Sequence, residues 1–294
     1  MIRILLQTTI PAVDDDWNIR RYSLLRGYLA SLEDERGKPL FAVTGRDREP
    51  DARGDDPVLS GLADSDFDEI WLFGADTGNG LSGRDCAGIT AFRHRGRGIL
   101  ATRDHQDAGS SIYPLGGVGA AHFFRTRNQD PDSSRRRVDD TETPAISWPN
   151  YHSGRNGDYQ HIIRLEPVHD LFRFPGSERK LIELFPAHPH EGGVGAPEGE
   201  RRARVIAMGR STITNRAFSL IVAFEEGEDR EGNRMGRALA HSSFHHFADY
   251  NWDTNAGCPS FVAEPPGDAM KQNPHALADI QAYVRNAALW LAGQ

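Results

Sequence analysis

Cysteine is scarce in this sequence, which has two, Cys86 and Cys258, among 294 residues. So few cysteines in so long a chain do not form the disulfide framework on which small secreted proteins depend. Long apolar runs are also missing: no stretch approaches the roughly 20 apolar residues of a membrane-spanning helix. The apolar start, residues 1–7, is too short for a signal peptide. We therefore expect a soluble, cytoplasmic protein that has no membrane partner.

Positive charge is in deficit. Lys and Arg total 34 against 42 Asp and Glu, a net charge of −8, and such diffuse negative charge disfavours phosphate backbones. The nearest thing to a basic patch, Arg135–Arg137, lies in a polar run beside aspartates and is interpreted as a solvated loop. We expect a small-molecule ligand and no nucleic acid. The sequence leaves the oligomeric state open, a homo-oligomer included.

The composition is sufficient for a folded core. Hydrophobic residues make up 38% of the chain and charged residues 26%, which excludes wholesale disorder. The sequence contains no internal repeat and no convincing linker. We expect a single domain over residues 1–294, with an irregular insertion near 128–160, where the chain becomes polar and rich in charge.

Short apolar runs alternate with helical patterns in the first hundred residues. This alternation predicts a mostly parallel sheet with helices on its faces. Strands are expected near residues 2–7, 39–44, 69–73 and 98–102, with helices over 17–32 and 82–94. Further strands are expected at 204–208, 218–224 and 237–240, with a charged hairpin loop at 225–234. Asn273-Pro274 predicts the start of the last helix, as an N-cap followed by proline.

The order of three segments resembles the class I glutamine amidotransferase-like superfamily. In residues 68–105 a strand, a helix and a glycine-rich Arg-His-Arg-Gly-Arg-Gly turn precede the strand that would lead to the nucleophile elbow. Pro186–Gly192 and Gly236–His246 follow, and the last helix ends in Trp-Leu-Ala-Gly. A Gly-Arg strand that leads into histidines before such a helix is similar to the trehalose-utilisation (ThuA-like) branch. The resemblance implies an α/β, flavodoxin-like fold with helices on both faces of the sheet, and a link to sugar metabolism.

The resemblance does not extend to glutaminase activity. That activity needs a thiolate at the elbow, where this sequence has Arg103, Asp104 and His105. Cys86 lies in the helix before the elbow strand and is interpreted as a small core residue. Cys258 follows the last strand. Neither cysteine is at the required position.

Asp104 and His105 are the first candidate site residues, because ligands of open α/β sheets bind outside the carboxyl ends of the strands. A carboxylate and an imidazole there can act as acid and base, or bind a metal. The alternative is an aspartate that caps a turn and an exposed histidine. Asp107 and His122 flank the following glycine-rich stretch, and either could line the same crevice.

His188, His190 and Glu191 form the densest short group. In an extended segment, His-x-His places both imidazoles on one side, and imidazole with carboxylate suits zinc, iron or nickel. The alternative is a polar loop shaped by its proline and glycines. The pattern recurs by chance, so we assign no metal ligand and leave a divalent metal open as a cofactor.

His241, His245 and His246 follow the last predicted strand. If residues 244–250 are helical, His245 shares a face with Asp249. Two adjacent histidines cannot both face one site, so we expect one of them to be structural. The alternative is an aromatic seam packed beneath the C-terminal helix.

Two weaker signals lie elsewhere. Gly116–Gly119 could present backbone N–H groups to an anion, but it lacks the lysine and hydroxyl of a P-loop and is interpreted as a turn. Several serines lie near histidines, yet no Gly-x-Ser-x-Gly elbow is present.

Two classes of function remain. The first is an enzyme that acts on a small polar or sugar-derived molecule, with Asp104, His105, His190, Glu191 and His245 as catalytic groups. In this hypothesis the ligand is bound by the four residues His188, His241, His246 and Asp107. Without a nucleophile, its chemistry would be acid–base or metal-assisted. The second is a binding or regulatory domain on the same scaffold, since a fold does not decide function. Convergence of the named residues in space would favour the enzyme.

Overall fold

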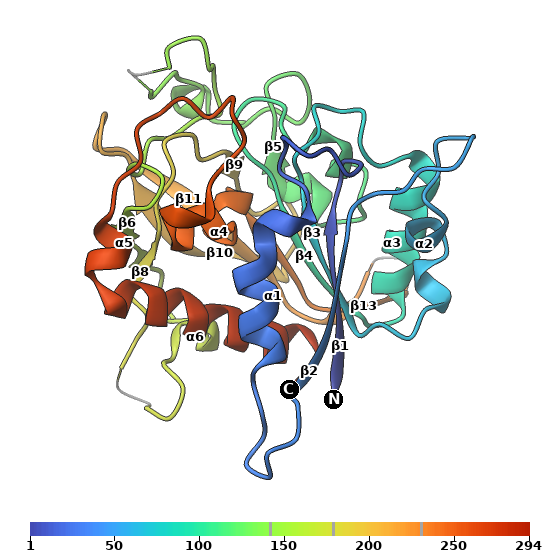
Figure 1. Ribbon diagram of the computed structural model, residues 1–294. Coiled ribbons are helices and arrows are strands. Elements are labelled where there is room, and N and C mark those ends of the chain that lie inside the picture. The colour runs from blue at the N-terminus through green and yellow to red at the C-terminus, as the bar shows by residue number, and fades with distance from the viewer. Residues whose placement is uncertain (141–142, 178–179, 230–231) are drawn as a thin grey trace.

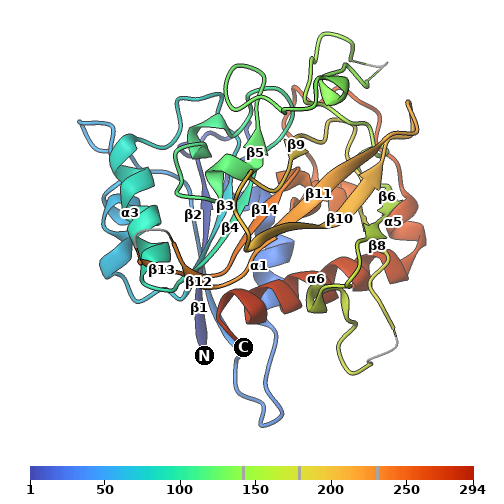
Figure 2. The ribbon, with the colours of Figure 1, turned by 180° about the vertical axis from the view of Figure 1, so that it is seen from behind.

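A mixed eight-stranded sheet forms the centre of the molecule (Figure 1). The computed structural model describes residues 1–140, 143–177, 180–229 and 232–294. The strand order is β2-β1-β3-β4-β14-β11-β10-β7. The strands are β1 Ile2–Thr8, β2 Phe41–Arg46, β3 Glu69–Phe73, β4 Gly98–Thr102, β7 Ile163–Arg164, β10 Ala203–Arg210, β11 Ala217–Phe224 and β14 Ala238–His241. The first four and β14 are parallel, whereas β11, β10 and β7 continue antiparallel. The long β10–β11 pair is clear in Figure 2.

The predicted α/β class is confirmed. All seven expected strands are present, with bounds that differ from the predicted ones by a few residues. β2 starts at Phe41 because Pro39 is bridged to Glu33 at the base of the preceding turn. Three small pairs lie outside the main sheet: β5 His122–Phe123 with β9 Gly193–Val194, β6 Tyr159–His161 with β8 Leu184–Pro186, and β12 Gly227–Glu228 with β13 Arg234–Met235.

Helices cover both faces of the sheet. They are α1 Ser23–Ala30, α2 Pro57–Ser60, α3 Gly83–His94, α4 Asp249–Trp252, α5 Ala269–Gln272 and α6 Pro274–Leu291. Single 3-10 turns are η1 Ile19–Tyr22, η2 Leu62–Asp64, η3 Ser110–Ile112, η4 Gly119–Ala121, η5 Ser133–Arg135, η6 Asp170–Phe172, η7 Phe244–His246 and η8 Thr254–Ala256. Side chains alternate along β1, so Ile4 and Leu6 join the core under α1 and α6, while Leu5 joins the core under α3. No helix of the described residues has both the length and the apolar character needed to cross a membrane.

Local sequence explains the two helices that were predicted best. α3 begins at a capping box in which Asp85 N donates to Ser82 Oγ (3.1 Å) and Ser82 N donates to Asp85 Oδ2 (3.0 Å). It buries Cys86, Ile89 and Phe92. In α6, His275 N donates to the side chain of the N-cap residue Asn273. Proline at its first position has no N–H to satisfy.

The expected helix over residues 17–32 is shorter and starts later. Asn18 caps η1, and α1 begins at Ser23. The N–H groups of Ser23 and Leu24 donate to Asp249, which lies more than two hundred residues away in sequence. The single helix over residues 244–250, on which a face shared by His245 and Asp249 depended, does not form. A separate 3-10 turn and α4 replace the single helix, and Asp249 caps α1.

Two long segments lie over the carboxyl end of the parallel strands. In Figure 1 the green loops after β5 and the red segment before α5 both lie at the upper end of the sheet, toward which β1 points. The first contains most of the polar insertion expected near 128–160, although residues 141–142 lie outside the described residues. The β12–β13 pair forms within the expected charged hairpin loop at 225–234 and extends one residue past it, and residues 230–231 lie outside the described residues.

Candidate functional site

The site is built where β4 and β14 end side by side. These strands are parallel neighbours, with His241 opposite Thr102. The chain segments that leave them therefore emerge at the same edge, and Phe244 N donates to Arg103 O (3.0 Å). This pairing brings Asp104 and His245 together, although they are far apart in sequence.

Asp104, His188 and His245 form a compact buried cluster. His188 Nδ1 lies 3.4 Å from Asp104 Oδ1, and His245 Nε2 lies 3.6 Å from Asp104 Oδ2. The two imidazoles stack with ring centroids 3.5 Å apart. The three side chains are only 3–5% exposed. One ligand atom from each lies within 4.8 Å of the other two, so the cluster could hold a metal ion.

Hydrogen bonds define the tautomer of each imidazole. Asn251 Nδ2 donates to Asn156 Oδ1 and Ala187 O, so Asn251 Oδ1 accepts a hydrogen bond from His245 Nδ1 (3.2 Å). The other ring nitrogen of His245, Nε2, faces Asp104. His188 Nδ1 accepts from His190 N (3.2 Å) and also faces Asp104. One ring nitrogen from each histidine thus faces the same carboxylate.

Electrostatics favour a cation in this cluster. Burial by itself would raise the pKa of Asp104, but the nearby His105 and His245 lower it further than burial raises it, so the carboxylate stays ionised. Burial, followed by the neighbouring His245, holds the pKa of His188 well below its usual value, so this imidazole stays neutral. Two ligands bound at about 2.1 Å to a tetrahedral cation lie roughly 3.4 Å apart. The observed separations of 3.4 and 3.6 Å fit that geometry.

His105 and His190 flank the cluster. Their rings pack edge to face at 5.4 Å, and His105 Nε2 lies 3.6 Å from Asp104 Oδ2. The His105 side chain is 27% exposed, far more than the three clustered residues, and so provides contact with solvent. Burial lowers the pKa of His105, although Asp104 opposes this effect.

Glu264 is a site neighbour that the sequence did not reveal. His190 Nε2 lies 3.0 Å from Glu264 Oε1, and Thr143 Oγ1 donates to the same oxygen (2.9 Å). The hydrogen bond from His190 lowers the pKa of Glu264 to about 2, against the effect of burial. Glu264 precedes two prolines in an irregular segment, and no periodicity or motif marks it.

Glu191 lies in a second, neighbouring cluster. Its carboxylate is fully buried and accepts from Ser153 Oγ (2.6 Å), Ser242 Oγ (2.7 Å) and Gln160 Nε2. His246 Nε2 is 3.1 Å away. With these partners Glu191 links the His188–His190 loop to the end of β14. It does not face Asp104, and the adjacent His245 and His246 point into different clusters.

Other candidate residues lie outside the cluster. His241 is fully buried, with Nε2 2.7 Å from Tyr283 Oη on α6, and burial holds its pKa well below the usual value. This position corresponds to the seam beneath the C-terminal helix. Asp107 accepts from Thr126 N and Oγ1, each at 3.0 Å, and so shapes its own loop.

The glycine-rich stretch forms a turn. Gly116 N donates to Thr90 Oγ1, and Gly119 N donates to Leu115 O. These N–H groups are therefore occupied and do not face an anion. Ser111 Oγ donates to Asp76 at 2.7 Å, and no histidine contacts that hydroxyl among the described residues.

His122 does not line the crevice, as the sequence suggested it could. Its ring is fully buried, with Nδ1 3.0 Å from Val118 O and Nε2 3.2 Å from Ala101 O. Burial, followed by the charge of Arg103, lowers the pKa of His122 to about 4.

This buried imidazole leads to a prediction about pH. The unfolded chain protonates His122 near pH 6.5, whereas the folded chain keeps it neutral down to about pH 4. The unfolded state binds more protons in this window, so stability falls as the pH drops from 6.5 toward 4. At about 1.4 kcal/mol per pKa unit, this contribution is at most roughly 3 kcal/mol. Urea unfolding at neutral and mildly acidic pH measures it. His122→Gln should show a smaller pH dependence than wild type, and equal dependence would contradict the prediction.

The fold and the site define the class of this protein. It is a flavodoxin-like α/β protein with a buried carboxylate–imidazole cluster at the carboxyl ends of its parallel strands. The sequence matches no protein-family model, and no curated protein matches it.

Solved structures show which fold the chain shares. It is similar to a ThuA-like protein from Parabacteroides merdae, with a TM-score of 0.52 and 14% identity over 99% of this chain and 90% of that one. The glutaminase domain of Trypanosoma brucei CTPS with bound acivicin aligns with a TM-score of 0.42 and 14% identity, over 97% of this chain and 94% of that one. The first likeness supports the predicted scaffold, and the second is too distant to carry an argument.

Proposed function

We propose that this protein is a ThuA-like enzyme that acts on a small polar or sugar-derived molecule and binds a divalent cation through Asp104, His188 and His245. The observation that carries the proposal is the convergence of an ionised carboxylate and two imidazole nitrogens at 3.4–3.6 Å in a buried cluster. A bound cation would compensate this arrangement and would activate a water molecule or polarise a substrate oxygen.

The flanking residues have separate roles in this proposal. His105 is partly exposed and its Nε2 lies 3.6 Å from Asp104, and in this proposal it exchanges a proton with the substrate. His190 donates from Nε2 to Glu264, which orients its ring over the cluster. Glu191 positions the loop that bears both His188 and His190 through its buried hydrogen bonds.

Cation binding tests the proposal directly. Metal-free protein is titrated with Zn²⁺ and with Mn²⁺ by isothermal calorimetry, and one equivalent of at least one ion is expected to bind. The double variant His188→Ala/His245→Ala should lose this binding. His161→Ala/His275→Ala is the matched control, because both histidines are exposed and lie outside the cluster. Absence of binding to wild type, or equal binding to the His188→Ala/His245→Ala variant, would reject the proposed cation site.

A second candidate is a non-catalytic binding or regulatory domain. The near-complete burial of the three clustered side chains favours it, since a substrate must reach reacting groups. The two candidates differ at His105. If the cation is only structural, His105→Ala leaves the cation affinity and the melting temperature of the cation-bound protein unchanged. An enzyme loses turnover on the same substitution.

We also predict that the protein releases no ammonia from glutamine. Burial raises the pKa of the Cys86 thiol to about 12, and its Sγ lies 3.6 Å from Ser111 O inside the core. A thiol that stays protonated is a poor nucleophile, because the thiolate is the reactive species. A coupled glutamate assay measures glutaminase activity, and Cys86→Ser should alter stability more than any turnover. Glutamine hydrolysis that iodoacetamide abolishes would contradict the prediction.

The cytoplasmic location and the sugar-derived substrate remain predictions from the sequence.

A further inference from the structure

A polar cavity lies at the end of the sheet opposite the Asp104 cluster. It has a volume of about 550 Å³, within the usual range for small-molecule sites. Arg204 near the start of β10, Glu225 just after β11 and Arg237 just before β14 all line it. Because β14 is parallel to β4, the cavity lies at the amino ends of the parallel strands. Asp104 lies at their carboxyl ends. We call this cavity the basal pocket.

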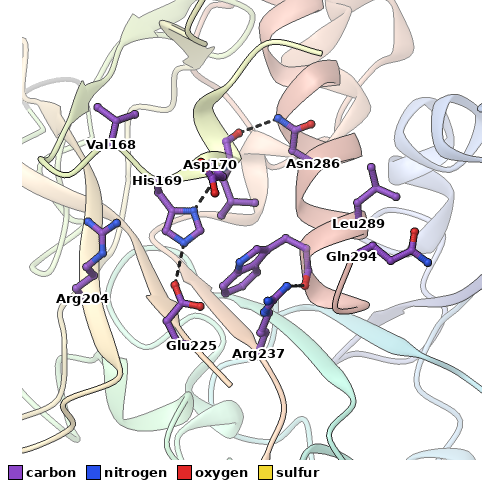
Figure 3. Close-up of a pocket in the computed structure, with 11 residues that line it drawn as sticks. Val168, His169, Asp170, Arg204, Glu225, Arg237, Asn286, Leu289 and Gln294 are labelled. Carbon is purple, nitrogen blue, oxygen red and sulfur yellow. Dashed lines mark hydrogen bonds and ion pairs between the residues drawn. The ribbon is translucent and has the colours of Figure 1, made fainter. Parts of the chain in front are cut away.

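Two arginines of the basal pocket have unused hydrogen-bonding capacity. The backbone of Arg204 pairs in the sheet, but its side chain makes no hydrogen bond or ion pair with the described residues. Arg237 Nη1 donates to Trp290 O (2.9 Å) and Nη2 lies 4.0 Å from Glu226 Oε1, whereas Nε is buried without a partner. In Figure 3 both guanidinium groups border the same space, on either side of Glu225. A guanidinium group provides a planar fork that matches phosphate and carboxylate oxygens.

The remaining wall of the pocket is both aromatic and polar. The Arg237 guanidinium lies 5.2 Å from the ring centroid of Trp290, and the His169 ring packs edge to face with Trp290 at a centroid distance of 5.2 Å. His169 Nδ1 accepts from Leu171 N, so its Nε2 donates to Glu225 Oε1 (3.3 Å). This bond leaves the second oxygen of Glu225 able to accept from a ligand, and Figure 3 shows that carboxylate at the pocket wall. The pocket therefore offers cationic forks, an indole surface and an anionic acceptor.

We propose that the basal pocket binds a small hydroxylated organic anion, with its phosphate or carboxylate group at Arg204 and Arg237. Its hydroxyl groups donate to Glu225, and its carbon skeleton packs on Trp290. A simple inorganic anion would not use the second oxygen of Glu225, and a neutral sugar would not compensate the positive charge of Arg204. The pocket should therefore prefer a molecule that carries both kinds of group.

Calorimetric titration tests this assignment. The protein is treated with chelator first, so that a cation at Asp104 cannot recruit the probe. D-glucose 6-phosphate and D-gluconate carry both an anionic group and hydroxyl groups, and we call them the combined probes. Inorganic phosphate provides only the anionic group, and D-glucose provides only the hydroxyl groups. At least one combined probe should bind at millimolar concentration or below, about tenfold or more tightly than either half. Its affinity should fall as salt is added.

Substitutions locate the binding site. Arg204→Gln should weaken binding by at least about tenfold, and Arg204→Lys by less, since lysine keeps the charge without the fork. Arg36→Gln removes the same charge from an exposed loop and should leave affinity unchanged. The variant His188→Ala/His245→Ala should still bind the probe, which separates this pocket from the proposed cation site. Circular dichroism and melting temperature verify that each variant folds.

Three results would overturn the assignment. They are no heat from either combined probe at low salt, equal affinity for D-glucose and D-glucose 6-phosphate, and wild-type affinity in a folded Arg204→Gln variant.

Discussion

Glu191→Ala is expected to lower the free energy of unfolding by about 3 kcal/mol or more. The substitution leaves buried donors on Ser153, Gln160 and Ser242 without their acceptor, and it removes the partner of His246. Each buried polar group left unsatisfied costs about 1–3 kcal/mol. Urea-induced unfolding, followed by far-ultraviolet circular dichroism, measures the difference.

Two further variants make this result interpretable. Glu191→Gln keeps one acceptor oxygen and should lose less stability than alanine. Glu35→Ala changes an exposed glutamate and should remain within about 0.5 kcal/mol of wild type. Because Glu191 positions the loop of His188 and His190, Glu191→Ala should also weaken cation binding. A change in stability below about 1 kcal/mol would show that the buried network contributes little.

Asp104→Asn is expected to weaken binding of the proposed cation by at least about 100-fold. Loss of residues that only orient metal ligands already weakens binding by about 10–100-fold, and Asp104 is the one charged ligand of the cluster. The amide has nearly the same shape, so the fold should persist. Calorimetry with the ion that wild type binds measures the change. Asp107→Asn is the matched control, because Asp107 contacts Thr126 and lies outside the cluster.

The metal-free form of the same variant provides a second readout. If two lone pairs face the carboxylate, removing its charge should leave the melting temperature unchanged or raise it. If Asp104 instead pairs with a protonated imidazole, the substitution removes a buried ion pair and should lower the melting temperature. Wild-type cation affinity in Asp104→Asn, together with a lower melting temperature, would contradict the assignment of Asp104 as a ligand.

The sequence alone was sufficient for the fold class. Short apolar runs alternating with helical patterns depend on local periodicity, and a parallel sheet follows from that alternation. The Asn273-Pro274 pair is equally local, and α6 begins where it predicts; α3 lies within the expected residues 82–94. The end of β4 is also predictable from local sequence, so the sequence alone predicts that Asp104 lies at the carboxyl end of a strand.

Only the tertiary structure decided which polar side chains share a cluster. β14 pairs beside β4, and this long-range choice brings His245 to Asp104 while the adjacent His246 faces Glu191. Asp249 caps a helix more than two hundred residues away, and Glu264 reaches His190 from a segment without periodicity. Periodicity predicts which face of a helix or strand is buried, but it does not predict which residues pack against that face. The partner of a buried polar group depends on strand order and loop paths, which contacts distant in sequence determine.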